Sequence, residues 1–212
     1  FGTPVVEETV TTASHTALVM AEGSYQWRVK AIDAAGNESD YSNAWAVDVD
    51  TTAPDAPVIT APTTGTITND NTPAVSGTAE AGSVVGILEA GVLASTVNAD
   101  ANGAWSTTLS TLLDGNYEFT ATATDAAGNT SVASTNVSIE VDTVAPEAPE
   151  ITSPVTGTIT NNNTPTFAGT AEAGSSVEIF EGANSLGMVS ADANGDWSFT
   201  SPVLADDLYM VT

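Results

Sequence analysis

The chain has 212 residues, 42% of them hydrophobic, and its 27 aspartates and glutamates stand against two basic residues, for a net charge of −25. This length suits one large domain or two to three small ones, and no segment reaches the ~18 consecutive apolar residues of a membrane-spanning helix. Phosphate groups are bound by clustered lysine and arginine, so nucleic acid and anionic membrane surfaces are excluded as partners.

The sequence contains no cysteine and one histidine, His15. A disulfide framework, a zinc-thiolate site, an iron-sulfur cluster and a thiol nucleophile are therefore excluded. His15 lies in a stretch rich in threonine and serine, and we interpret it as a surface residue. The chain begins at Phe1 without the basic and apolar regions of a signal peptide, so we expect it to be part of a longer protein.

An internal repeat with a period of 92 residues organises the chain. The segments that recur at this offset are 33–37 at 125–129, 50–57 at 142–149, 64–73 at 156–165, 77–83 at 169–175 and 99–106 at 191–198. A fixed period of this kind indicates a tandem array. We predict the C-terminal part of one module at 1–50, a complete module at 51–142 and the N-terminal part of a third module at 143–212.

Alternating apolar and polar residues in the complete module predict β-strands, as in the run from Tyr117 to Thr124. The predicted strands are 57–61, 73–79, 84–89, 92–97, 104–109, 116–124 and 131–141. Clusters of Gly, Asn, Asp and Pro separate them, and no segment has helical periodicity. Short strands at this spacing predict an all-β fold of tandem immunoglobulin-like sandwich modules in an elongated array, with Trp105 and Trp197 in the cores.

Four recurring segments carry a family resemblance: Asp-Thr-x-Ala-Pro at 50–54, and the turns at 77–83, 99–106 and 125–129. Together they resemble the bacterial Ig-like repeats of large secreted adhesins, of the RTX and biofilm-associated types. The resemblance implies an extracellular stalk on the bacterial cell surface that projects a terminal binding domain. Residues 1–50 are also similar to bacterial fibronectin type III modules.

Acidic residues are predicted to gather at both ends of the complete module. If the strands alternate in direction, the turns at 77–83, 98–103 and 125–129 share the end beside the preceding linker, and the turns at 65–72, 90–92 and 110–115 share the other end. The first junction would then collect Asp50, Asp55, Asp125, Glu80, Asp100, Glu22 and Asp48. The second junction would collect Asp142, Glu147, Glu172, Asp192, Asp70 and Asp114.

Carboxylates in such clusters suit calcium, which takes about six to eight oxygen ligands. Bound calcium would cancel the repulsion between the acids and hold one module to the next. Asp50, Asp55 and Asp125 are the first choices as ligands, because a linker and a hairpin are the smallest set that bridges two modules; the counterpart of Asp125 in the second junction lies past Thr212. The alternative is that these acids form a solvated surface or satisfy the backbone of their turns.

The sequence favours a structural role over catalysis. It has no Gly-x-Ser-x-Gly, His-Glu-x-x-His or phosphate-binding glycine motif, and prolines after each junction predict short, semi-rigid linkers. The alternatives are a carbohydrate- or ligand-binding module, with Tyr41, Trp45 and Trp197 as candidate platform residues, and a spacer module appended to an extracellular enzyme. The expected partners are neighbouring modules of the same chain and calcium, and we expect a monomer.

Overall fold

The computed structural model describes Val10 and residues 19–205, in which one compact unit ends at Thr143 and a second begins at Val144. All regular secondary structure in this part of the chain is β-strand, so it contains no helix that could cross a membrane. The all-β prediction is therefore confirmed. His15 and most of the segment 1–21 lie outside the described residues.

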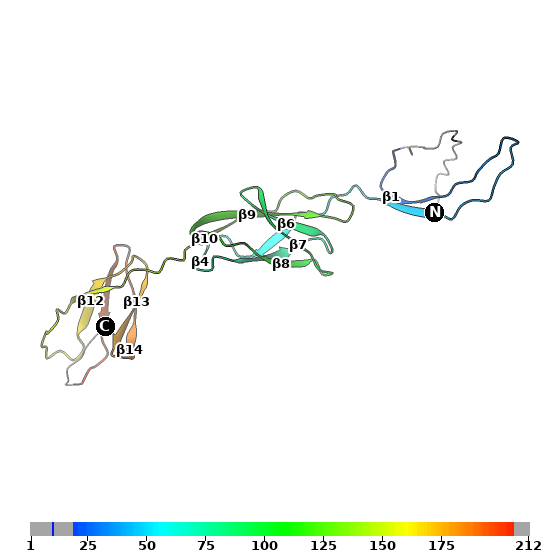
Figure 1. Ribbon diagram of the computed structural model, residues 1–212. Coiled ribbons are helices and arrows are strands. Elements are labelled where there is room, and N and C mark those ends of the chain that lie inside the picture. The colour runs from blue at the N-terminus through cyan, green and yellow to red at the C-terminus, as the bar shows by residue number, and fades with distance from the viewer. Residues whose placement is uncertain (1–9, 11–18, 206–212) are drawn as a thin grey trace. The chain divides into compact units, whose positions relative to one another are not determined.

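The central module is a sandwich of two sheets (Figure 1). The first sheet contains, in spatial order, β3 (Val58–Ala61), β5 (Ala74–Thr78) and β8 (Ala104–Thr108). The second contains β4 (Thr66–Thr68), β10 (Val137–Val141), β9 (Gly115–Thr124), β6 (Val84–Glu89) and β7 (Val92–Asn98). Every pairing is antiparallel except that of β4 with β10. This is the predicted immunoglobulin-like architecture.

Side chains from the inner faces of both sheets form one core. Along β9, burial follows the predicted alternation, with Phe119, Ala121 and Ala123 buried and the residues between them partly exposed. The buried core consists of Val75, Val85, Ile87, Ala99, Trp105, Leu109, Phe119, Ala121, Val137, Ile139 and Val141. Trp105 is 4% exposed, which confirms its predicted place in the core.

Trp105 packs against a glycine on the neighbouring strand. Gly77 pairs with Trp105 across β5 and β8. A β-carbon at Gly77 would overlap the carbonyl oxygen of Val58 and lie 2.7 Å from Cζ2 of Trp105. Gly169 and Trp197 make the same close approach 92 residues later. The repeated glycine is therefore required because a backbone carbonyl of the neighbouring strand and the indole together occupy the space of a side chain.

Two strand predictions in the central module are corrected. The strand expected at 131–141 begins only at Val137. Before it, the hydroxyls of Ser131 and Ser134 accept hydrogen bonds from the amides of Ala123 and Ala121, so serine side chains replace part of the regular ladder. The turn expected at 65–72 contains strand β4, because Thr66–Thr68 pairs in parallel with β10.

A tyrosine side chain fixes the entry to β9. The Tyr117 hydroxyl donates to the carbonyl oxygen of Leu113 at 2.9 Å and accepts from the amide of Leu113 at 3.1 Å. Tyr25 donates in the same way to the carbonyl oxygen of Ala21 at 2.8 Å. This contact four residues upstream is the tyrosine corner of immunoglobulin-like sandwiches.

The first module is described through its last two strands, β1 (Gly23–Trp27) and β2 (Trp45–Val49). Their register repeats that of β9 and β10, since Tyr25 pairs with Val47 as Tyr117 pairs with Ile139. The 92-residue repeat therefore extends to the pairing of individual residues.

The second compact unit repeats the first strands of the central module. One sheet contains β11 (Glu150–Ser153), β12 (Thr166–Thr170) and β15 (Asp196–Thr200), and β13 (Ser176–Glu181) forms a hairpin with β14 (Asn184–Ser190). Trp197 lies in its core, as predicted. Residues 158–160, the counterpart of β4, are not a strand. In the central module the corresponding segment is a strand through its pairing with β10.

We expect Gly77→Ala to destabilise the central module by about 1–3 kcal/mol or more, because the added methyl group has no space between Val58 and Trp105. Calorimetric unfolding of the full chain measures this loss. Gly86→Ala is the matched control, since its β-carbon would meet only the flexible end of Leu93 at 3.1 Å and the Thr122 hydroxyl oxygen at 3.4 Å. Equal losses for the two variants would contradict the packing argument.

Candidate functional site: the module junctions

The aspartates of the predicted turns accept hydrogen bonds from their own turns. One carboxylate oxygen of Asp125 accepts from the amides of Ala127 and Asn129, each at 2.9 Å, and the other accepts from the Asn129 side chain at 2.9 Å. Asp100 accepts from the amides of Asn102 at 2.7 Å and Ala104 at 2.9 Å. These carboxylates stabilise the tight turns in which they lie.

The same hydrogen bonds lower the pKa values of these aspartates. The side chain of Asn129 is the main cause of the lowered pKa of Asp125. The amide of Ala104, followed by that of Asn102, lowers the pKa of Asp100. Each donor stabilises the ionised carboxylate more than the neutral acid. The pKa values of Asp33 and Asp192 are lowered by equivalent turn contacts.

The linker after Asp50 is hydrogen-bonded on both sides. The Asn129 side-chain amide donates to the carbonyl oxygen of Asp50 at 3.1 Å. The carboxylate of Glu22 accepts from the hydroxyls of Thr52 at 2.6 Å and Thr51 at 3.4 Å. The linker is therefore in contact with the last turn of the central module and with the last hairpin of the first module.

The next linker begins with an equivalent contact. Asp114 accepts from the amide of Thr143 at 3.0 Å and from its hydroxyl at 2.7 Å. Asp114 and Thr143 lie 92 residues after Glu22 and Thr51. An acid before the penultimate strand of a module thus holds a threonine at the start of the following linker, in both places where the structure describes the pair.

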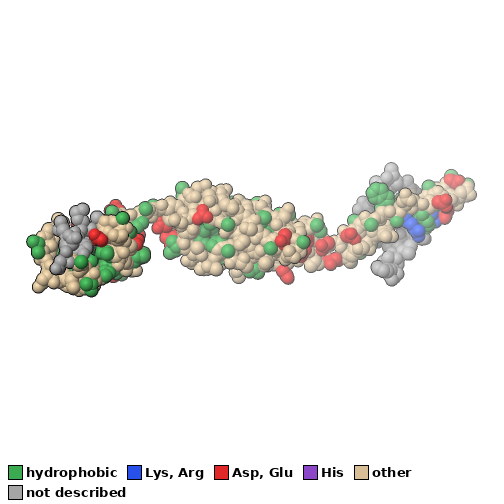
Figure 2. Space-filling view, turned by 90° about the horizontal axis from the view of Figure 1, so that it is seen from below, with side chains coloured by type: hydrophobic (Ala, Val, Ile, Leu, Met, Phe, Trp, Pro, Cys, Tyr) green, Lys and Arg blue, Asp and Glu red, His purple; other side chains and the backbone are tan. Residues whose placement is uncertain are grey.

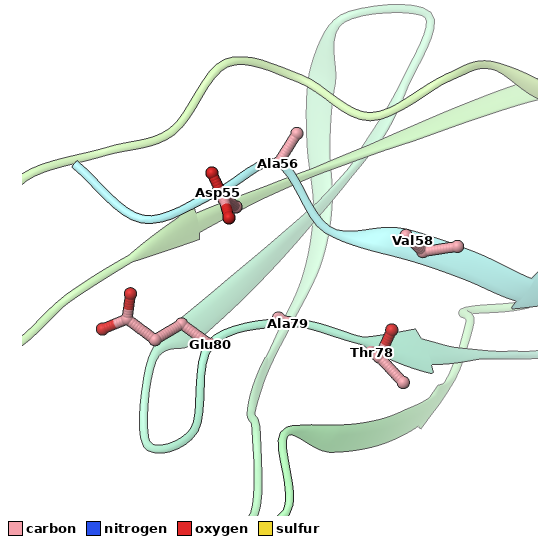
Figure 3. A pocket seen from close by; sticks show the side chains of 6 residues that line it. All are labelled: Asp55, Ala56, Val58, Thr78, Ala79 and Glu80. Atoms are coloured by element: carbon pink, nitrogen blue, oxygen red, sulfur yellow. The ribbon is translucent and has the colours of Figure 1, made fainter.

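A shallow hollow of about 340 Å³ lies between the linker, β3 and the end of β5. Asp55 and Glu80 are the acids among its lining residues, and Figure 3 shows both on one side of the group, away from Val58 and Thr78. The second unit repeats this feature with Glu147 and Glu172, in a hollow of about 430 Å³. Paired carboxylates at one position of the fold are therefore a feature of both units.

The predicted layout of the turns is confirmed at both ends of the central module. Beside the preceding linker, the amide of Ala79 donates to the carbonyl oxygen of Gly103, and Asn129 contacts Asp50. At the other end, the amide of Leu112 donates to the carbonyl oxygen of Asn71. Figure 2 shows acidic side chains gathered near the end that carries the linker to the first module.

The predicted ligands of the first junction do not all line the same hollow. Asp55 and Glu80 line one hollow, whereas Asp50, Asp100 and Asp125 are not among its lining residues. The backbone amide of Asp142 donates to the carbonyl oxygen of Thr68, and Glu147 lines the hollow of the second unit. Within residues 19–205, no group of three or more acidic or histidine side chains is placed to hold a metal ion.

The three aromatic residues considered for sugar binding have different environments. Trp197 is buried. The Arg28 guanidinium lies 4.1 Å from the ring centroid of Tyr41 and the Lys30 ammonium 5.6 Å from it, so cations of the same hairpin cover that ring. Trp45 is 77% exposed. It lies opposite Trp27 on the face that corresponds to the buried face of β9 and β10.

Sequence reasoning missed Asn129, Thr52 and Thr143 as junction residues. It treated the acids as metal ligands, with the backbone of their own turns as the alternative partner, and did not consider side-chain donors. The available signal was the repetition of each donor with its acceptor: Asn37 with Asn129, and Thr51 with Thr143, recur at the same offset as the acids.

The sandwich topology, the tyrosine corners and the 92-residue repeat define a tandem immunoglobulin-like module protein. The family model of the bacterial Ig-like domain matches residues 60–143 and 152–212. The chain belongs to this family, and the resemblance to bacterial Ig-like repeats is confirmed.

Similar sequences occur inside two enzymes. The chain is 39% identical over 141 residues to chitinase A1 of Niallia circulans, a match that covers 62% of the chain and 19% of that protein. It is 31% identical over 219 residues to exoglucanase B of Cellulomonas fimi, covering 94% of the chain and 19% of that protein. The chain thus spans about a fifth of the length of these relatives.

Two solved structures are similar at low identity. The fibronectin(III)-like modules of Clostridium thermocellum CbhA are 17% identical, with a TM-score of 0.46 over 69% of this chain and 79% of theirs. The BSP domain of a biofilm-associated protein is 20% identical, with a TM-score of 0.30 over 74% of this chain and 26% of its own.

The lowered pKa values predict loss of stability in acid. A carboxylate whose pKa is lower in the folded state than in the unfolded state stabilises the fold. This contribution is fully present above the ordinary aspartate pKa of 3.8 and is lost as the pH falls through the pKa of the folded state. The unfolding temperature of the central module should therefore fall below about pH 4, and Asp100→Asn should weaken this dependence. Glu140→Gln, at an exposed position outside the turns, is the control; identical pH profiles for both variants would contradict this account.

Proposed function

We propose that the chain is a non-catalytic extender segment of an extracellular bacterial protein. The observation that carries this proposal is the repeat itself: the same turn sequences recur every 92 residues, and an acid contacts the first threonine of the following linker in both places where the structure describes the pair. A segment that only separates other domains needs modules that are alike, whereas a recognition site needs one module to differ. Membership of the bacterial Ig-like family supports the proposal.

Two settings suit such an extender. One is the stalk of a cell-surface adhesin, as the resemblance of the repeats implies. The other is a spacer within a secreted polysaccharide-degrading enzyme, which the similarity to parts of a chitinase and an exoglucanase favours. In both settings the segment works by holding a binding or catalytic domain at a distance.

A carbohydrate-binding role is the alternative, because Trp45 and Tyr41 are exposed. The extender proposal predicts that the chain is not retained on chitin or cellulose, since Trp45 occupies a core-facing strand position and the Arg28 guanidinium lies over one face of the Tyr41 ring. A pull-down with each insoluble polysaccharide, with bovine serum albumin as the control, measures retention. Retention that is lost in Trp45→Ala would favour the binding module instead.

Calcium at the junctions stays a prediction from the sequence. The paired carboxylates of Asp55 with Glu80, and of Glu147 with Glu172, are the positions where two candidate ligands share one hollow. Two carboxylates fall short of the about six to eight oxygen ligands that calcium prefers. Backbone carbonyls, water and a neighbouring module would have to supply the remaining ligands.

Small-angle X-ray scattering of the full chain tests the extender proposal, in millimolar calcium and then in EDTA. A compact protein of this length would have a radius of gyration of about 17 Å, and we expect a clearly larger value in both buffers. A value near the compact one would contradict the extender role. A maximum dimension that shortens only on chelation would establish calcium as the stiffening agent, and an unchanged profile would refute that part of the hypothesis.

A further inference from the structure

The contact between Asn129 and the Asp50 carbonyl joins the last turn of the central module to the linker that precedes this module. The two residues are 79 positions apart in the sequence. A primary amide carries two N–H donors. In Asn129 the side-chain nitrogen serves two acceptors, the Asp125 carboxylate at 2.9 Å and the Asp50 carbonyl at 3.1 Å. Both N–H groups of the Asn129 side chain are therefore engaged in hydrogen bonds.

Asp125 orients that amide. Its carboxylate accepts from both the backbone and the side chain of Asn129, each at 2.9 Å. In the first module, Asp33 holds Asn37 with the same two hydrogen bonds, each at 2.8 Å. The Asp-Ala-Ala-Gly-Asn turn therefore orients its asparagine side chain by itself, independently of the contact with the linker.

The linker residues after this contact are packed as well as hydrogen-bonded. Pro54 and Pro57, which follow the contact with Asn129, are buried.

The other side of the linker is held by Glu22, which accepts from the Thr52 hydroxyl at 2.6 Å. In the next linker, Asp114 holds Thr143, the counterpart of Thr51, at 2.7 Å. The acceptor is a carboxylate in both cases, and hydrogen bonds to charged groups are stronger than those between neutral groups. These contacts need no metal ion.

We propose that the Asp-Ala-Ala-Gly-Asn turn is a metal-independent lock for the linker that precedes its own module. Asn129 holds the Asp50 carbonyl, Asp125 is the positioning residue for Asn129, and Glu22 holds the linker from the preceding module. The proposal rests on the extender function and identifies the residues that would limit bending between the first and central modules.

Distance measurements between spin labels test the lock in the full chain. The sequence has no cysteine, so Asn43→Cys in the first module and Ala94→Cys in the central module, both at exposed positions, provide the two label sites. Double electron-electron resonance in EDTA should give a narrow distance distribution. In Asn129→Ala the ratio of locked to unlocked linker should fall by about two- to tenfold, the effect of losing one hydrogen bond, and the distribution should broaden.

Matched variants separate the lock from general loss of structure. Asp125→Asn should broaden the distribution, whereas Asp33→Asn, the same change in the turn of the first module, should not. Thr52→Val removes the hydroxyl that Glu22 accepts from, lies in the linker outside both cores, and should also broaden the distribution. An unchanged distribution in Asn129→Ala and Thr52→Val, with a normal circular dichroism spectrum, would overturn the lock.

The mean distance and the width of the distribution report on different proposals. A broad distribution in the unsubstituted chain would overturn the lock while leaving the extender function intact, provided the mean distance stays long. A short mean distance, with the two modules folded against each other, would contradict the extender function itself. A distribution that narrows only when calcium is added would also overturn the lock and would favour the metal hypothesis.

Discussion

The structure depends on one constraint of composition: 27 carboxylates share a chain with only two basic side chains. Ion pairing is therefore not available as a general means of holding these groups, and within the described residues it is seen between Lys30 and Glu38. The carboxylates instead accept hydrogen bonds from backbone amides, threonine hydroxyls and asparagine amides. Such donors are neutral. They stabilise the ionised form of the carboxylates, and the surface keeps its negative charge.

This constraint connects the turns to the linkers. An aspartate that organises a turn, such as Asp125, also fixes the direction of the asparagine that it holds. That asparagine then reaches the linker backbone at Asp50. Local turn chemistry and the contact between the central module and its linker are therefore one arrangement, and the turn itself recurs at Asp33 and Asn37. A tandem protein that holds its junctions in this way can lengthen by duplication, because every copy brings its own turn, acid and threonine.

The period and the strand alternation predicted the sandwich and its core well. The positions of Phe119 and Trp105 followed from the sequence alone, because burial of one face imposes a period of two. Strand β4 and the late start of β10 did not follow, since Thr66–Thr68 is a strand only through its pairing with residues about 70 positions away. Repetition and strand direction located the acids at the module ends, and calcium at those ends stays a prediction. The donors that hold the acids did not follow from the sequence, because the contact of Asn129 with Asp125 depends on the local fold of the turn.

The central claim is that the turn carboxylates are held by the protein's own hydrogen-bond donors. Carbon-13 NMR titration of the aspartate carboxyl groups, in EDTA and in millimolar calcium, tests it most directly. The account predicts that Asp100 and Asp125 have pKa values below the ordinary 3.8, and that calcium leaves their signals unchanged. Ordinary pKa values, or saturable shifts of these two signals on adding calcium, would contradict it.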